Sequence, residues 1–206
     1  MKPVLTFAPH SRASRVLVQR AQCGALEAVE LQPVTIRRPT GGAVDPANPH
    51  PEGKVPYLTH NGEEIRESVA VMQYLDEMLG YPMGIAPGQA GRGSYLAWLA
   101  YYAGVFEPVL LVALAGVEHP VLSANWRGMA EVMAALEARL ASHDWLAGDK
   151  LTLADLLMAS AFQFAPQILP ESAVIRAWYG RVAPLFESAE VAALAGPATR
   201  GVDAGG

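Results

Sequence analysis

The sequence has only one cysteine, Cys23, among its 206 residues, and it has no C-x-x-C pair. An intrachain disulfide and a thioredoxin-type dithiol cycle are therefore both excluded. The amino end carries an apolar run that is too short for a secretory signal peptide. These features lead us to expect a protein of a reducing, cytoplasmic compartment.

Charge and long apolar runs are also scarce. Only 17% of the residues are charged, and 15 Lys and Arg against 20 Asp and Glu give a net charge of −5 with no basic block. Nucleic acid is therefore not an expected partner. No apolar stretch reads as an unbroken membrane span, so we expect no membrane partner. The five histidines are scattered, and no zinc-protease, Walker or dinucleotide motif occurs, so no metal is expected.

What the chain does have is a hydrophobic content of 51% and enough length for one or two domains. The first 80 residues alternate short apolar runs with turn signals and predict strand, helix, strand, loop, strand, strand and helix. In order, these elements cover residues 3–7, 11–24, 28–34, 37–51, 57–59, 63–66 and 68 onward. The loop is rich in Pro, Gly and Asn and is expected to hold at most a short helix around Asp45. This βαβ–ββα order is typical of a thioredoxin-like α/β domain with a mixed four-stranded sheet.

Residues 80–93 are rich in Gly and Pro and predict a linker between two domains. Beyond it every periodic pattern is helical, and Pro108 is expected to kink the first long helix. A last short helix is expected after Pro184. We therefore predict a thioredoxin-like domain at 1–80, a linker at 81–93 and an all-helical bundle at 94–206, with a frayed tail from residue 196.

The segment from Gly53 to Asp76 has features that suit a small peptide ligand. Val55 precedes Pro56, so it is held in extended geometry and can pair with an added strand. The Asn61-Gly62 hairpin follows. Ser68 opens a helix, where a hydroxyl and free backbone N–H groups can receive a carboxylate, and Glu67 can hold an ammonium group.

A second motif lies between Trp145 and Asp155. Thr152 and Asp155 have the spacing of a capping box, and the following helix is so apolar that we expect it to be central. Thr152→Ala or Asp155→Ala should cost on the order of 1 kcal/mol or more of stability. The motif predicts a folding element and gives Asp155 no catalytic role.

Together, Val55-Pro56, Glu67-Ser68 and the Thr152–Asp155 cap resemble the motifs of the glutathione transferase family, over nearly the whole chain. The resemblance implies a cis Pro56 and a glutathione site that includes Lys54, Val55, Pro56, Glu67 and Ser68. It also implies a helical domain that receives an electrophilic small molecule or a hydroperoxide as second substrate. Members of the family are usually homodimers.

Catalysis in such a protein requires a group that keeps the glutathione sulfur as thiolate, because a free thiol with a pKa near ~8.5 is mostly protonated at neutral pH. Phe7 stands where some classes carry a tyrosine, and no cysteine lies near the first helix. Serine-using classes, such as theta and zeta, place a serine four or five residues before an arginine. Ser11 precedes Arg15 by four and is our candidate, although Ser11 as a helix cap only, His10 as donor, or backbone N–H groups remain alternatives.

Other candidates are less specific. Lys54 can pair with the glycine carboxylate of glutathione or be a solvated lysine, and Arg37, Arg38 and His50 are further candidates for that carboxylate. Aromatic residues on the first long helix, which could bind an apolar electrophile, are more often core residues. They are Trp98, Tyr101, Tyr102 and Phe106.

The sequence thus predicts a glutathione transferase, of a serine-using or beta-like cytosolic class, with glutathione as co-substrate. Two alternatives are a non-catalytic binding or assembly module on the same fold, and a glutathione-dependent isomerase, lyase or dehalogenase. Intact Val55, Glu67 and Ser68 favour an enzyme.

Overall fold

The computed structural model describes residues 1–39, 41–126 and 128–195. Its four-stranded sheet has the order β2-β1-β3-β4, with β1 parallel to β2, and with β1–β3 and β3–β4 antiparallel. The strands are β1 (Val4–Phe7), β2 (Glu30–Pro33), β3 (Tyr57–His60) and β4 (Glu63–Ile65). The predicted mixed sheet is confirmed, as is the hairpin, where Asn61 and Gly62 have φ angles of 51° and 84°.

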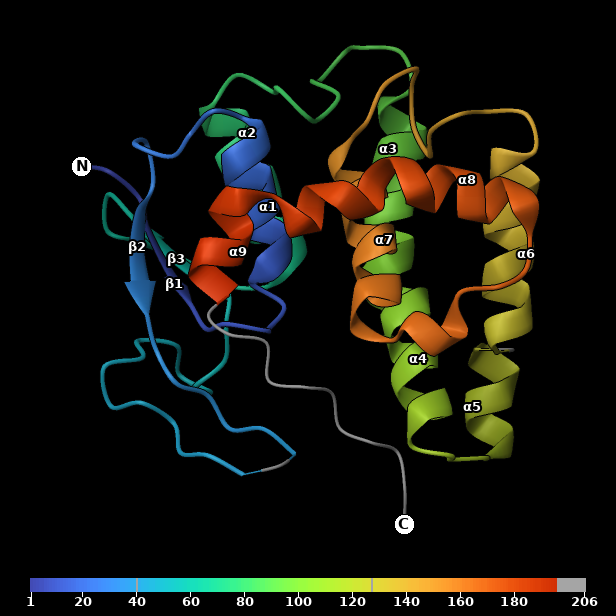
Figure 1. The fold of residues 1–206 in the computed structure, drawn as a ribbon, viewed down its shortest axis with the longest axis horizontal. Coiled ribbons are helices and arrows are strands. Elements are labelled where there is room, and N and C mark those ends of the chain that lie inside the picture. The colour runs from blue at the N-terminus through green and yellow to red at the C-terminus, as the bar shows by residue number, and fades with distance from the viewer. Residues whose placement is uncertain (40, 127, 196–206) are drawn as a thin grey trace.

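Two helices, α1 (Ser14–Gln22) and α2 (Ser68–Met78), pack together beside the sheet (Figure 1). The buried amide of Gln19 on α1 donates a hydrogen bond to the carbonyl of Met72 on α2 at 2.8 Å. One sequence-based expectation is wrong here: helix α1 begins at Ser14 rather than near Ser11, because residues 8–13 form a separate turn. The described residues around Asp45 form a loop without a helix, which agrees with the expectation of at most a short one.

Helices make up the remainder of the described chain (Figure 1). They are α3 (Arg92–Tyr101), α4 (Glu107–Leu114), α5 (Pro120–Asn125), α6 (Met129–Leu140), α7 (Leu153–Phe164), α8 (Ala173–Val182) and α9 (Ala189–Ala195). Helix α9 returns to the first domain and packs on α1 (Figure 1). The helical prediction is confirmed, although α5 was not predicted and the tail from residue 196 lies outside the described residues.

Both prolines singled out in the sequence lie at or directly after irregular helical turns. The chain between α3 and α4 forms a π-helical turn, Tyr102–Phe106, so the irregularity precedes Pro108, which occupies the first turn of α4. Pro184 lies at the start of a 3-10 turn, Ala183–Glu187, and the short helix expected after it follows as α9. Pro108 lacks the N–H that would reach back into the π-helical turn, where the carbonyl of Gly104 accepts the indole N–H of Trp126 at 2.9 Å.

By length and composition alone, one helix, Arg92–Leu114, is long and apolar enough to cross a membrane, although Glu107 and Pro108 interrupt its apolar run. It has 23 residues, and its most apolar 18 residues have a mean hydropathy of 1.6 and are 28% buried. Its inward face contributes Tyr95, Leu99, Tyr102 and Phe106 to the core. The other face is apolar and exposed at Leu96, Leu111 and Leu114.

Helix α7 is the central helix, with every residue from Leu153 to Phe162 buried. The capping box is confirmed: the Asp155 carboxylate accepts hydrogen bonds from the backbone N–H of Thr152 at 2.9 Å and from its hydroxyl at 2.8 Å. The same carboxylate accepts from the backbone N–H of Leu146 and the indole N–H of Trp178. Asp155 therefore ties three segments of the helical domain together, as a folding residue.

Candidate functional site

The β3–β4 hairpin brings the two parts of the predicted peptide-binding segment together. The peptide bond between Val55 and Pro56 is cis, as the family resemblance implies. In the hairpin, Leu58 pairs with Ile65 and Thr59 with Glu64. The ladder ends at this Leu58–Ile65 pair, and the Val55–Pro56 bond precedes it on one strand while Glu67 and Ser68 follow it on the other. Residues 55–56 and 67–68 thus lie at one end of the hairpin.

The start of α2 presents donors and acceptors that the fold does not use. Glu67 adopts φ 67° and ψ 126°, a left-handed backbone geometry that is strained for a residue with a side chain. The Glu67 and Ser68 side chains, and the N–H groups of Ser68, Val69 and Ala70, make no hydrogen bond within the described residues. A helix N-terminus of this kind favours a carboxylate ligand.

Ser11 lies in a tight turn between β1 and α1. Its hydroxyl donates to the carbonyl of Ala8 at 2.7 Å, and its oxygen accepts from the N–H of Ala13 at 3.2 Å. His10, directly before it, has φ 50°, and its exposed ring makes no hydrogen bond within the described residues. Ser11 is therefore not the cap of α1, whose N-cap residue is Ala13.

A polar cluster joins this turn to the helical domain. Arg12 donates to the Glu107 carboxylate at 2.5 Å, and the guanidinium of Arg15 lies 3.7 Å from the same oxygen. Arg15 is buried and donates to the Tyr102 hydroxyl at 2.9 Å, while its Nε and Nη1 are buried without partners. Burial raises the pKa of Tyr102, so its hydroxyl is a neutral acceptor for Arg15. The sequence pattern did not indicate Glu107, because its partners are 92 or more residues away.

The four basic candidates for a glutathione carboxylate have different environments. Lys54 is exposed and pairs with Glu52 at 2.5 Å. Arg37 is exposed and makes no hydrogen bond within the described residues, whereas Arg38 donates to the carbonyls of Pro9 and His10. His50 is buried and accepts the N–H of Glu52 on Nδ1 at 3.0 Å, and burial lowers its pKa. His50 thus supports the loop before Val55.

The aromatic candidates on α3 and the π-helical turn divide into two pairs. Tyr102 and Phe106 are core residues, with ring centroids 5.9 Å apart. Trp98 and Tyr101 are half-buried and pack edge-to-face, with their ring centroids 5.5 Å apart. The four therefore do not form one open aromatic surface.

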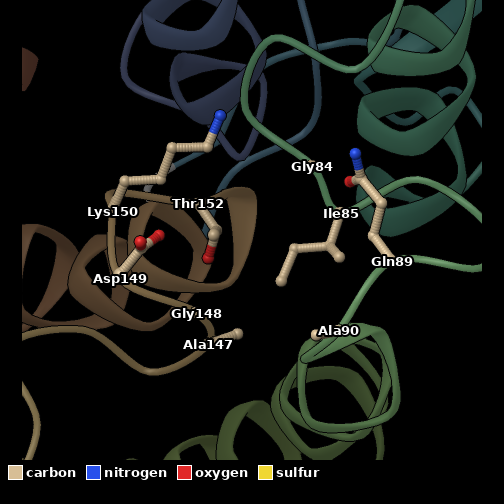
Figure 2. A pocket seen from close by; sticks show the side chains of 9 residues that line it. All are labelled: Gly84, Ile85, Gln89, Ala90, Ala147, Gly148, Asp149, Lys150 and Thr152. Carbon is tan, nitrogen blue, oxygen red and sulfur yellow. The ribbon is translucent and has the colours of Figure 1, made fainter.

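A cavity of about 310 Å³ lies elsewhere, between the linker and the loop before α7 (Figure 2). It contains none of the predicted site residues. Its lining consists of Gly84, Ile85, Gln89, Ala90, Ala147, Gly148, Asp149, Lys150 and Thr152. Residues 1–39, 41–126 and 128–195 contain no group of three or more His, Cys, Asp or Glu able to hold a metal. Cys23 is half-buried at the end of α1, and burial, with a smaller contribution from Asp76, raises its pKa to about 11.

Comparison with known proteins agrees with this arrangement. The family model "Glutathione S-transferase, N-terminal domain" matches residues 9–81, and "Glutathione S-transferase, C-terminal domain" matches residues 108–184. Glutathione S-transferase F10 of Arabidopsis thaliana is 26% identical over 205 residues, which cover 91% of this chain and 93% of the relative. Glutathione S-transferase-like protein LUC7 of Fusarium sp is 28% identical, over 93% of this chain and 91% of the relative.

Solved structures show the same fold. A sphingomonad glutathione S-transferase complexed with glutathione is 21% identical and has a TM-score of 0.69, over 93% of this chain and 96% of the other. Glutathione transferase F7 of Populus trichocarpa is 23% identical with a TM-score of 0.68, over 90% and 96% of the two chains. Since models for both domains match, on either side of the linker, the chain belongs to the glutathione S-transferase family.

Proposed function

We propose that the protein is a glutathione transferase that binds glutathione at the end of the β3–β4 hairpin and directs its thiolate at an electrophilic small molecule or a hydroperoxide. The observation that carries this proposal is that the cis Val55–Pro56 bond and the Glu67-Ser68 pair lie at the same end of the β3–β4 hairpin. An extended peptide can pair with the backbone of Val55. Ser68 and the unused N–H groups of α2 then receive the γ-glutamyl carboxylate, and Glu67 receives the ammonium group.

The remaining roles follow from the same placement of glutathione. Lys54 is the proposed contact for the glycine carboxylate, after release from its exposed pair with Glu52. Ser11 is the proposed donor to the thiolate, and its hydroxyl has to leave the carbonyl of Ala8 to act in this way. Catalysis is then positioning and electrostatic support of a thiolate.

The binding claim is tested by calorimetric titration of glutathione into the unmutated protein, Ser68→Ala and Glu67→Ala. We expect each variant to bind about tenfold or more weakly, because each loses a charged or charge-assisted contact. Glu63→Ala, which removes an exposed carboxylate from β4, is the control and should bind as the unmutated protein does. No binding by the unmutated protein would refute the proposal.

The catalytic claim is tested by conjugation of glutathione to a chloronitrobenzene. Ser11→Ala should lower the rate by about tenfold or more, since it removes a donor to developing negative charge. Full activity in Ser11→Ala together with a loss in His10→Ala would reassign the role to His10.

A non-catalytic binding module is the second candidate, and one observation favours it: the Ser11 hydroxyl is already bonded to Ala8. Glutathione binding of normal strength without conjugation or peroxidase activity on any tested electrophile would establish this candidate. An isomerase or dehalogenase would show turnover with its own substrate class instead.

We further propose that the active form is a cytoplasmic homodimer with a role in detoxification. The exposed apolar face of the Arg92–Leu114 helix supports a second copy as the covering partner, because a helix this apolar is seldom left in contact with water. Leu96→Glu, combined with Leu111→Glu, should shift the sedimentation coefficient to that of a monomer. The matched control is Glu118→Gln, an exposed change outside that face.

A further inference from the structure

The guanidinium of Arg38 binds the turn that precedes α1. Its Nη1 donates to the carbonyl of His10 at 2.9 Å, and its Nη2 donates to the carbonyl of Pro9. These bonds join the loop after β2 to the turn after β1. Two N–H groups of one planar fork thus hold two consecutive peptide groups, which a lysine ammonium cannot reproduce.

Arg38 is itself fixed in place. Its backbone N–H donates to the carbonyl of Gly41, and the N–H of Gly41 donates back to the carbonyl of Arg38, each at 3.0 Å. The side chain is half-buried, whereas that of neighbouring Arg37 is exposed and makes no hydrogen bond within the described part of the chain. Of these two adjacent arginines, only Arg38 therefore makes side-chain hydrogen bonds within the described residues.

The two hydrogen bonds from Arg38 fix the orientation of these two peptide groups and therefore the direction of their N–H groups. In a trans peptide the N–H lies opposite the carbonyl, so the N–H groups of His10 and Ser11 point away from Arg38. His10 has φ 50°, and a left-handed residue in a turn lets successive N–H groups converge on an anion. Within the described residues, neither N–H has an acceptor.

We propose that Arg38 is a positioning residue for thiolate formation, which orients the N–H groups of His10 and Ser11 toward the sulfur of bound glutathione. The inference rests on the proposed function and deepens it. In this account the two backbone N–H groups act together with the Ser11 hydroxyl, which donates to the carbonyl of Ala8 in the structure and joins them only after leaving that carbonyl. Arg38 touches neither the sulfur nor the carboxylates of glutathione in this account.

The test compares Arg38→Ala, Arg38→Gln and Arg38→Lys with Arg37→Ala as the matched control. The pKa of the bound glutathione thiol is measured by ultraviolet difference absorbance of the thiolate, and the dissociation constant by calorimetry. Arg38→Ala and Arg38→Gln should raise the thiol pKa by about one unit, a tenfold loss of thiolate below that pKa. The dissociation constant should change less than about threefold, Arg38→Lys should fall between, and Arg37→Ala should match the unmutated protein.

Weaker glutathione binding with an unchanged thiol pKa would overturn the proposal and make Arg38 a ligand of the glycine carboxylate. If both the thiol pKa and the dissociation constant are unchanged in Arg38→Ala, the proposal is also overturned, and the two hydrogen bonds of Arg38 serve folding only. Failure of the unmutated protein to bind glutathione at all would instead refute the proposed function. In that case backbone 15N relaxation decides the positioning claim alone: lower order parameters at His10 and Ser11 in Arg38→Gln than in Arg37→Ala support it, and equal order parameters overturn it.

Discussion

The guanidinium of Arg15 on α1 donates to the hydroxyl of Tyr102 in the helical domain at 2.9 Å, and its central carbon lies 4.9 Å from the centre of the Tyr102 ring. Both residues are buried, and the hydroxyl also lies 3.5 Å from Ser160 on α7. The contact joins the first turn of α1 to the π-helical turn. A buried cation is tolerated here because the hydroxyl, the ring face and Glu107 all compensate its charge.

Tyr102→Phe should therefore lower the free energy of unfolding by about 2 kcal/mol, because a buried charged donor loses its hydrogen-bond acceptor. The measurement is urea denaturation followed by tryptophan fluorescence. Tyr179→Phe is the control: its hydroxyl makes no hydrogen bond within the described residues, and its ring should keep its contact with Phe162. Equal losses in the two variants would contradict an energetic role for the Arg15 contact.

Asp155→Asn should lower the free energy of unfolding by on the order of 3 kcal/mol or more, since several buried donors lose a charged acceptor. This exceeds the loss expected for a simple helix cap, because Leu146 and Trp178 also bind the carboxylate. Thermal unfolding of Asp155→Asn beside Asp149→Asn, which changes an exposed side chain, measures the difference. A loss no larger than that of Asp149→Asn would show that the network contributes little.

His50 should make stability depend on pH near neutrality. Burial lowers the pKa of its folded form below the ordinary value of 6.5, so in the window between these values the unfolded chain binds more protons. The contribution of His50 is therefore present above 6.5 and is lost as the pH falls through that window. His50→Asn keeps an acceptor for the Glu52 N–H but does not titrate. Urea denaturation from pH 5 to 8 should show the unmutated protein gaining stability relative to His50→Asn as the pH rises.

Glu67→Gly should be about 1 kcal/mol more stable than Glu67→Ala, because glycine adopts the φ of 67° without the steric cost that alanine retains. Both variants lose the carboxylate and should bind glutathione equally weakly. Chemical denaturation and glutathione titration of the same two samples separate the two effects. An alanine variant as stable as the glycine variant would indicate that the backbone of Glu67 relaxes after substitution.

The sequence was sufficient for features that depend on neighbouring residues. The Asn61-Gly62 hairpin, the start of α2 at Ser68 and the capping box of α7 all follow from residues a few positions apart. The mixed sheet and the helical second domain follow from the order of these elements. Such features are local, so their signals survive in the order of residue types along the chain.

The environment of the proposed thiolate site was decided by tertiary structure. Ser11 was expected near the first turn of α1, but its hydroxyl closes a separate turn, which no residue pattern distinguishes from a helix cap. Glu107, Tyr102 and Arg38 reach that turn or α1 from other parts of the fold. The sequence does not indicate which distant group a charged side chain will contact in the folded protein. Local preference thus set the elements of this protein, and tertiary packing within and between its two domains set the partners of Arg12, Arg15 and Arg38.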